Sequence, residues 1–323
     1  MSGFSAKPKT YMLDLYHADA QELFQQATTI DGVMPQDPRC ADWHSDAEAL
    51  IIRSETKLRR EDFEKAKHLK IVTKQGVGVD NIDLDAAKEH GVQIFNTPAV
   101  NSETVAEMAL ALGLALARRI TEFDRVIRAG EKVQRSKMLG IGLRGKTVGI
   151  VGMGNIARFA ANKWIGAVEA NIVAYDPYAP ADAWSDIPHH RAQSVLDLIE
   201  KSHVITLHVP LTDSTRHIIG EKELAAMKPD AILLNTARGG LVDEAALLKT
   251  LNAGGLWGVA LDAQDIEPPT REVHGPLLDT GKVILTPHVG GSTNECQILI
   301  GTTAVRVLLA ALAGEPEARC RVV

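Results

Sequence analysis

Short apolar runs alternate along the chain with segments in which apolar residues recur every three or four positions. The first pattern is typical of buried strands, and the second is typical of helices that cover a sheet. In the first third of the sequence the runs fall at residues 11–16, 49–52, 70–73 and 93–95, with helical patterns at 18–28, 60–68 and 83–90. Alternating strands and helices predict parallel strands, so residues 1 to about 100 are expected to form a small α/β domain.

A second series of apolar runs follows a long helical pattern. Asn101 is expected to cap a helix from Ser102 to about Arg128, which is apolar enough to be buried between domains or between subunits. A full doubly wound sheet is then predicted from six runs, at residues 147–151, 171–175, 204–207, 231–234, 258–261 and 283–286. A last helix at about 293–313 is expected to return to the first domain. The predicted organisation is a larger domain, 102–289, inserted in a smaller one made of 1–101 and 290–323.

The run at 147–151 ends in a glycine fingerprint. Gly152, Gly154 and Ala157 form the pattern Gly-x-Gly-x-x-Ala, and a helical pattern follows. The first glycine permits a tight turn, the second leaves room for a pyrophosphate, and the alanine lets the helix approach the strand. Free N–H groups at the helix start, those of Asn155 and Ile156 among them, would bind the phosphates. Gly-x-Gly alone is weak evidence, because it recurs at residues 76–78 and 140–142.

An acidic residue downstream strengthens the dinucleotide interpretation. Asp176 ends the run at 171–175 and lies 176 − 157 = 19 residues beyond Ala157. A spacing of roughly 20 is expected for the carboxylate that binds the ribose hydroxyls of the adenosine half. A carboxylate repels a 2′-phosphate, and Pro177 and Tyr178 bring no arginine to bind one, so the predicted cofactor is NAD rather than NADP. The alternative is a tight turn with a surface aspartate.

Three later runs are each followed by residues that suit hydride transfer. Arg238 follows 231–234, Asp262 and Glu267 follow 258–261, and His288 follows 283–286. Ligands of doubly wound sheets bind at the carboxyl ends of the strands. There a guanidinium would bind a substrate carboxylate two-pronged, and a histidine oriented by a carboxylate would accept a hydroxyl proton. Taken singly, each residue could instead be a surface charge or a satisfied core residue.

Composition limits the partners and the compartment that can be expected for this protein. The chain has 323 residues, 24% of them charged, and a net charge of −6, which argues against a general nucleic-acid binder. Its three cysteines, Cys40, Cys296 and Cys320, match no metal spacing and are expected to be reduced thiols of a cytoplasmic protein. The first residues lack the apolar core of a signal peptide, and the apolar stretch at 108–117 is too short to span a bilayer. No metal, nucleic acid or membrane partner is therefore predicted.

These motifs carry a family likeness. Over essentially its whole length the chain resembles the D-isomer-specific 2-hydroxyacid dehydrogenases, with matching blocks at residues 76–83, 152–157 with 176, 208–212, 235–240, 267–268 and 286–288. The resemblance implies two doubly wound α/β domains. A Rossmann NAD-binding domain would be inserted in a smaller flavodoxin-like substrate (lid) domain, with the substrate bound between them.

The same resemblance implies residue roles. Arg238, Glu267 and His288 would be catalytic, and Asp262 would contact the nicotinamide carboxamide. Val77 and Gly78 would offer backbone N–H groups to the substrate carboxylate. Further cofactor contacts would come from His208, Val209, Pro210, Thr212, Thr236, Ala237 and His288. The helix after Asn101 would form the contact of a homodimer.

Within the family the chain looks most like the D-3-phosphoglycerate dehydrogenases. Arg53 in Arg-Ser-Glu-Thr resembles an arginine that faces the substrate phosphate, and Arg135 resembles a second one donated across the dimer. Such a phosphate adds about two negative charges, which extra cations would balance. The favoured substrate is therefore 3-phosphoglycerate, or phosphohydroxypyruvate in reverse; hydroxypyruvate, glyoxylate or another 2-oxo acid is the alternative. The direction of the reaction in the cell and the choice of dimer or tetramer stay open.

Departures from the family pattern are also visible. Lys74 stands where these enzymes usually have arginine, and Ala263-Gln264 replaces the commoner Val-Phe. Residues 270–274 look like an insertion before His288. The sequence ends soon after the last predicted helix, so serine feedback through a C-terminal regulatory domain is not expected. A less favoured interpretation is that the protein is an NAD-sensing corepressor of the C-terminal binding protein type. Formate dehydrogenase activity is disfavoured, because those enzymes have glutamine where this chain has Glu267.

Overall fold

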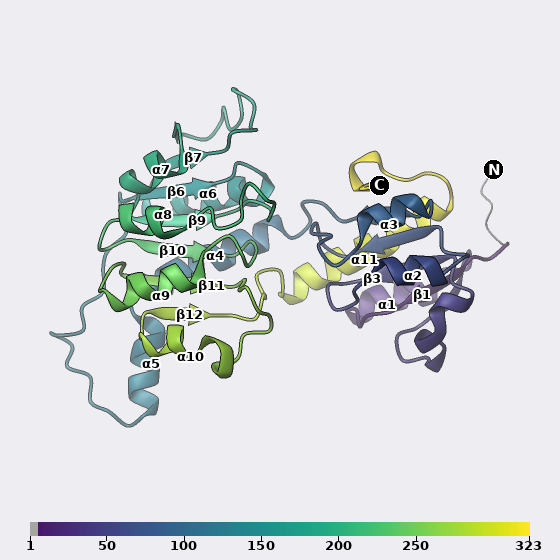
Figure 1. Cartoon of the computed structure of the whole chain (residues 1–323), viewed down its shortest axis with the longest axis horizontal. Coiled ribbons are helices and arrows are strands. Elements are labelled where there is room, and N and C mark those ends of the chain that lie inside the picture. The colour runs from purple at the N-terminus through teal and green to yellow at the C-terminus, as the bar shows by residue number, and fades with distance from the viewer. Residues whose placement is uncertain (1–5) are drawn as a thin grey trace. The chain divides into compact units, whose positions relative to one another are not determined.

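The computed structural model describes residues 6–323, so residues 1–5 of the predicted first domain lie outside the described part. The chain forms two compact units (Figure 1). Unit 1 contains the residues up to Asn101 together with Ser292–Val323, and unit 2 is Ser102–Gly291. Each unit has its own parallel sheet, which confirms the predicted α/β fold class.

Unit 1 is built on a five-stranded parallel sheet of order β2-β1-β3-β4-β5. Its strands are β1 (Lys9–Met12), β2 (Asp31–Val33), β3 (Ala49–Ile52), β4 (Ile71–Lys74) and β5 (Gln93–Asn96). Its helices are α1 (Ala18–Gln25), α2 (Arg60–Lys65), α3 (Leu84–Glu89) and α11 (Asn294–Leu312), with short 3₁₀ segments η1 (Pro38–Ser45) and η2 (Ala318–Cys320). One buried cluster includes residues of α1 and α11 and another includes residues of α2 and α3, so both sheet faces are covered. Strands buried on both faces explain the unbroken apolar runs.

Unit 2 is built on a seven-stranded parallel sheet of order β12-β11-β10-β9-β6-β7-β8. Its strands are β6 (Thr147–Val151), β7 (Asn171–Tyr175), β8 (His190–Arg191), β9 (Val204–Leu207), β10 (Ile232–Asn235), β11 (Gly258–Leu261) and β12 (Val283–Leu285). Its helices are α4 (Ser102–Ala117), α5 (Ile120–Arg128), α6 (Asn155–Val168), α7 (Val195–Lys201), α8 (Glu221–Ala226), α9 (Glu244–Asn252) and α10 (Arg271–Asp279). The strand order reverses between β6 and β9, which is the point where doubly wound sheets bind ligands.

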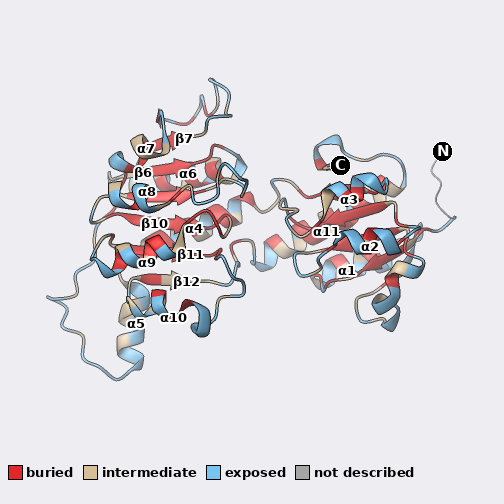
Figure 2. Ribbon diagram, viewed as in Figure 1, coloured by how far each residue is buried: buried red, intermediate tan, exposed pale blue. Residues whose placement is uncertain are grey.

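Helices cover both faces of the larger sheet. Residues of α4 and α6 contribute to one buried cluster, and residues of α7, α8, α9 and α10 contribute to the other. Figure 2 shows the strands of both sheets buried and the outer helix surfaces exposed. The loops that follow the strands therefore start from a sheet that is packed on both faces.

Three sequence expectations were wrong in detail. The predicted helix 102–128 is two helices, because Arg119 has a left-handed backbone with φ of 55° and its side chain pairs with Glu122 of the next turn. Asn101 does not cap α4 with its side chain, since its buried Oδ1 accepts no hydrogen bond in the described chain. The short strands β2 and β8 were missed because neither carries an apolar run.

The two longest helices are core elements of their own units. The buried residues of α4 contact α6, β10 and β11 within unit 2, whereas burial between domains or subunits was expected. Among the described residues only α11 is long and apolar enough to cross a membrane by length and composition. It contacts α1, β3, β4 and β5, and Ala304, Val305 and Leu308 are fully buried. Its apolar character is therefore that of a core helix.

Candidate active site

The glycine fingerprint forms a tight turn between β6 and α6. Gly152 has φ of 96°, and a Cβ there would collide with the carbonyl of His208. Gly154 directly precedes α6, and a Cβ on it would meet no atom within 4 Å. Ala157, in the first turn of α6, is fully buried in the cluster between this helix and the sheet. The turn therefore leaves open space above Gly154 at a helix N-terminus, which fits a pyrophosphate.

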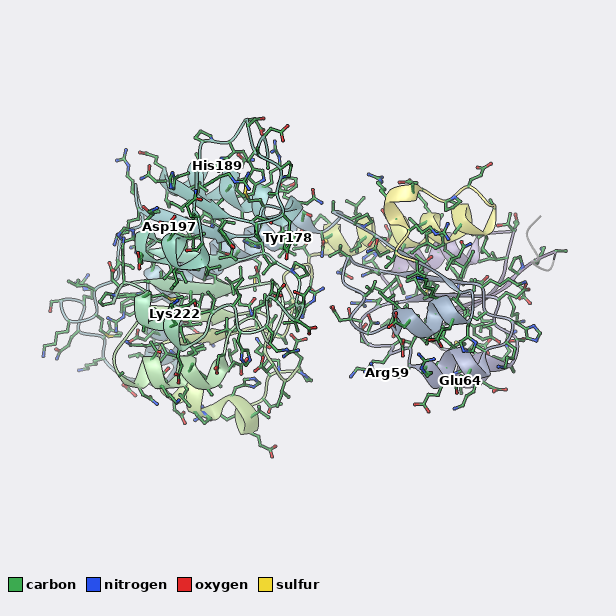
Figure 3. The ribbon with its side chains drawn as sticks, turned by 45° about the horizontal axis from the view of Figure 1, so that its top comes forward. Arg59, Glu64, Tyr178, His189, Asp197 and Lys222 are labelled. Carbon is green, nitrogen blue, oxygen red and sulfur yellow. The ribbon has the colours of Figure 1, made fainter. Side chains whose placement is uncertain are left out.

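Asp176 lies beside this turn at the end of β7. Its Oδ2 accepts a hydrogen bond of 2.9 Å from Met153 N, and its Oδ1 accepts one of 2.9 Å from Tyr178 N. A carboxylate has about four acceptor positions, so both oxygens keep capacity for ribose hydroxyls. Tyr178 itself is 83% exposed on unit 2 (Figure 3). The carboxylate thus orders the glycine turn, and its contact with the adenosine ribose stays a prediction.

Buried polar atoms without partners gather at the same edge of the sheet. Within the described chain His208 Nδ1, Thr236 Oγ1 and Gln264 Oε1 are buried and form no hydrogen bond. They follow β9, β10 and β11. Burial also lowers the pKa of His208 to about 4, so its ring is neutral at pH 7. Unpaired buried polar atoms are costly, and a polar ligand bound at this edge would satisfy them.

Glu267 and His288 form the most direct pairing among the predicted site residues. His288 Nδ1 lies 3.0 Å and 3.1 Å from the two carboxylate oxygens of Glu267. Burial opposes ionisation of Glu267, but hydrogen bonds from His288 and the Gln264 N–H, with the charges of His288 and Arg238, keep its pKa below the ordinary value. An ionised Glu267 accepts the Nδ1–H, which leaves His288 Nε2 free to take or give a proton.

Asp262 holds the loop that carries His288. It is 1% exposed and accepts hydrogen bonds from Thr286 Oγ1 (2.6 Å), Val289 N (2.9 Å) and Gly290 N (2.8 Å). These bonds flank His288, whose φ of 54° is uncommon for a residue with a side chain. Asp262 therefore fixes an otherwise unfavourable backbone at the proposed proton-transfer residue. Its contact with the nicotinamide stays a prediction.

Arg238 lies on the loop after β10, close enough to Glu267 for its charge to favour the carboxylate. Its Nη1 donates to the carbonyl of Ala237 at 2.7 Å, and its own carbonyl accepts from Asn235 Nδ2 at 2.7 Å. The Asn235 side chain thereby fixes the turn that presents the guanidinium. A guanidinium presents its N–H donors in a planar fork, the geometry of a two-pronged carboxylate contact.

The remaining predicted cofactor residues lie on two loops of the same edge. Ala237 is buried and donates its N–H to Asn235 Oδ1. The loop after His208, which carries Val209, Pro210 and Thr212, is closed by Thr215: its hydroxyl donates to the Pro210 carbonyl at 2.7 Å and accepts from Thr212 N at 2.8 Å. The roles assigned to these residues stay predictions.

The predicted substrate residues fall in both units. In unit 1, Asn81 joins the loop of Arg53 to the loop of Val77 and Gly78, because its Nδ2 donates to the carbonyls of Arg53 and Thr56. Arg53 Nη1 donates to Leu15 O at 2.7 Å, and Val77 is 45% exposed. Arg135 is exposed on the segment between α5 and β6 of unit 2.

Comparison with known proteins decides the family. Residues 110–290 match the sequence model of the NAD binding domain of the D-isomer specific 2-hydroxyacid dehydrogenases. The chain belongs to this family. The match covers the glycine turn, Asp176 and the Glu267–His288 pair, and it confirms NAD as the predicted cofactor.

Two named relatives differ in the activity that their names give. D-3-phosphoglycerate dehydrogenase of Methanocaldococcus jannaschii is 39% identical over 95% of this chain and 58% of the relative. Hydroxypyruvate reductase of Thermotoga maritima is 41% identical over 80% of this chain and 83% of the relative. The chain spans about half the length of the first curated relatives it matches.

Solved structures show the same architecture. The TT0316 protein of Thermus thermophilus has a TM-score of 0.85 and 33% identity, with 98% of this chain and all of that chain covered. A D-lactate dehydrogenase of Aquifex aeolicus, solved with NAD and lactic acid, has a TM-score of 0.83 and 26% identity over 95% of this chain and 96% of that one.

The site contains one residue that the sequence did not single out as functional. In the sequence Gln264 is only a departure from Val-Phe, yet in the structure it is 3% exposed and contacts Glu267 through its backbone N–H. A polar residue next to a buried strand end was the available signal. The residues 270–274, expected as an insertion, form the N-cap and first turn of α10, and His274 is buried there.

Proposed function

We propose that this chain is an NAD-dependent oxidoreductase that transfers a hydride between the cofactor and a D-2-hydroxy acid or its 2-oxo form. The observation that carries the proposal is the Glu267–His288 hydrogen bond at the sheet edge that also holds the glycine turn and Asp176. An oriented imidazole beside a dinucleotide site is what alcohol oxidation by hydride transfer requires. Family membership and the names of the relatives support the same class of reaction.

The proposed mechanism assigns each residue one task. Arg238 binds the substrate carboxylate, with the N–H groups of Val77 and Gly78 as further donors. His288 Nε2 removes the hydroxyl proton while Glu267 stabilises the imidazolium that forms. NAD, when bound, would accept the hydride that leaves the substrate carbon. In the reverse direction His288 returns the proton to the carbonyl oxygen.

We propose 3-phosphoglycerate, or phosphohydroxypyruvate in reverse, as the substrate pair. Arg53 supports this choice, because its guanidinium is held by Leu15 and still has free donors for a phosphate. Glu55 lies 3.6 Å from Arg53 Nη2 and would compete with that phosphate. Arg135 would supply a second cation from a partner subunit. Hydroxypyruvate, glyoxylate or another 2-oxo acid is the alternative, and the hydroxypyruvate reductase relative favours it.

The test is NADH oxidation with a panel of 2-oxo acids that includes phosphohydroxypyruvate, hydroxypyruvate and glyoxylate. A kcat/KM for phosphohydroxypyruvate far above that for hydroxypyruvate supports the phosphate assignment. The opposite preference overturns that assignment and leaves the reductase alternative. No turnover with any 2-oxo acid, in protein that still binds NADH, refutes the enzyme proposal and favours the corepressor-type sensor.

We also propose that the chain is a cytoplasmic homodimer. None of the three cysteines forms a disulfide within the described residues, as in a reducing compartment. None of the residues of α5 is buried, even though the helix contains large apolar side chains. Ile120 is 56% exposed and Ile127 is 65% exposed. An apolar helix face of this kind is typical of a subunit contact. Ile127→Asp is expected to produce monomers in sedimentation experiments, and an unchanged assembly would exclude this face.

A further inference from the structure

Gln264 occupies an unusual position for a polar residue. It follows β11 by three residues and is 3% exposed, among residues that carry the proposed catalytic groups. Its Nε2 donates to the carbonyl of Leu261 at 2.6 Å and to the carbonyl of Thr286 at 3.0 Å. Leu261 ends β11 and Thr286 follows β12, so one amide group joins the ends of two neighbouring strands.

This contact sets the orientation of the amide. Both neighbours of Nε2 are carbonyl oxygens, which only accept, so the amide cannot be turned over without losing both bonds. The other atom, Oε1, is buried and has no partner in the described chain. Leaving an amide oxygen unpaired in the interior is unfavourable. The site thus keeps a donor at Thr286 although an apolar side chain would avoid the unpaired oxygen.

The backbone of residues 264 and 265 contacts Glu267 on the same loop and the loop of Arg238 after β10. Gln264 N donates to Glu267 Oε1 at 3.3 Å. The Gln264 carbonyl packs so closely on Gly239, next to Arg238, that no Cβ fits there. Gly240 N also donates to Asp265 Oδ1. Residues 264 and 265 therefore contact the loops of Arg238, Glu267 and His288.

We infer that Gln264 is a positioning residue that holds the His288 loop at the distance from Glu267 at which the two side chains pair. Its backbone fixes Glu267, its side chain fixes Thr286, and Thr286 lies two residues before His288. The inference rests on the proposed dehydrogenase function, because only that function gives the Glu267–His288 pair a role in turnover. Gln264 does not touch the substrate in this role.

Gln264→Met is the decisive variant. Methionine has a similar length, removes the donor and removes the unpaired oxygen. Neither carbonyl loses its last partner, because Thr286 N also donates to Leu261 O and His288 N also donates to Thr286 O. The resistance to urea is therefore expected to stay near that of the wild type. The kcat is expected to fall about tenfold or more, since small misplacements of reacting groups cost up to a hundredfold, while KM for NADH stays unchanged.

Ser202→Ala is the matched control for stability. Ser202 is fully buried, and its hydroxyl donates to Leu198 O at 2.6 Å near the start of β9, at the opposite edge of the sheet. This variant is expected to unfold at lower urea concentration with kcat unchanged. A Gln264→Met enzyme with wild-type kcat would overturn the inference, and so would a Ser202→Ala enzyme with the same loss of kcat.

A second readout is independent of activity. The nitrogen chemical shifts of the His288 ring report which tautomer the neutral imidazole adopts, and the signal can be assigned by its absence in His288→Gln. Pairing with Glu267 holds the proton on Nδ1, so the wild type is expected to show one tautomer and Gln264→Met a mixture. If the wild type turns over none of the 2-oxo acids but this change is seen, the proposed function fails and the positioning role stands. An unchanged tautomer in Gln264→Met overturns the positioning role.

Discussion

The carboxyl edges of the two sheets are built in different ways. In unit 2 this edge contains three buried polar atoms without a partner in the described chain, and a histidine with a left-handed backbone. In unit 1 four side-chain hydrogen bonds join the loops at the corresponding edge, although Thr73 Oγ1 of β4 is buried without a partner in the described chain and Ala99 also has a left-handed backbone. Asp14 accepts from Arg53 N and Thr56 Oγ1, Asn96 Nδ2 donates to Val77 O, and Thr97 Oγ1 accepts from Gly76 N.

The two edges are therefore suited to different functions. A paired edge holds loops rigidly and presents backbone N–H groups and a cation, which suffices to bind an anion. An edge with unpaired groups and a strained residue is less stable by itself and gains most from a ligand that completes it. We therefore expect changes in unit 2 to alter turnover and pH dependence, and changes in unit 1 to alter the choice of substrate.

The largest effect is expected from His288→Ala. Loss of a general base costs on the order of a hundredfold to ten-thousandfold in turnover. NADH binding should persist, because the glycine turn and Asp176 do not depend on the imidazole. Steady-state kinetics and NADH fluorescence titration measure the two quantities, with the exposed His68→Ala as control. Near-normal turnover in His288→Ala would remove the central residue of the mechanism.

A second large effect concerns stability and pH. Burial lowers the pKa of His208 to about 4, whereas a histidine of the unfolded chain titrates near 6.5. Between these values the unfolded chain binds a proton that the folded chain does not, so stability falls as the pH drops from about 6.5 to about 4. The full loss is on the order of 3 kcal/mol.

Urea unfolding at several pH values without cofactor measures this loss. His208→Gln is expected to lose less stability than the wild type on acidification, while the exposed His90→Gln should behave as the wild type does. If His208→Gln and the wild type lose stability equally, the neutral imidazole of His208 is not the cause.

Some features of the fold could be predicted from the sequence and others could not. The strands were predictable because both faces of each sheet are covered, which makes β3 or β10 an unbroken apolar run. The break in the helix at Arg119 was not predictable from the sequence. It depends on a left-handed backbone and on an ion pair with Glu122 that composition does not reveal. A two-residue strand such as β8 has no periodicity from which to predict it.

For the site, the sequence predicted which residues lie close together but not the hydrogen bonds that hold them. Residues following successive parallel strands must meet at one edge, so Glu267 and His288 could be placed near each other from sequence. The three hydrogen bonds of Asp262 and the bridge made by Gln264 could not, because they depend on loop conformations. Their only sequence signal is a polar residue in a position that becomes buried.

A smaller effect, confined to one substrate class, is expected from Arg53→Glu. Hydrogen bonds to charged groups contribute about 1.5–3 kcal/mol, so kcat/KM for phosphohydroxypyruvate should fall about tenfold to a hundredfold. The value for hydroxypyruvate should change little, because Arg53 lies on the paired edge and would contact only the phosphate. Arg59→Glu, an exposed arginine of the same unit (Figure 3), is the control. Equal losses on both substrates would mean that Arg53 supports the fold and not the phosphate.

The smallest effect is expected at the start of α7, which follows the outermost strand β8 of unit 2 and carries none of the proposed site residues. Ser194 Oγ accepts the N–H of Asp197 at 3.1 Å and so caps the helix; Asp197 is labelled in Figure 3. Ser194→Ala should lower the free energy of unfolding by about 1 kcal/mol, and Ser194→Asp should preserve it. Because the cap holds none of the loops that follow β6, β9, β10, β11 and β12, kcat/KM should be unchanged in both variants. A Ser194→Ala enzyme with altered kcat would show that turnover responds to stability in general, and the contrast between the two edges would then lose its meaning.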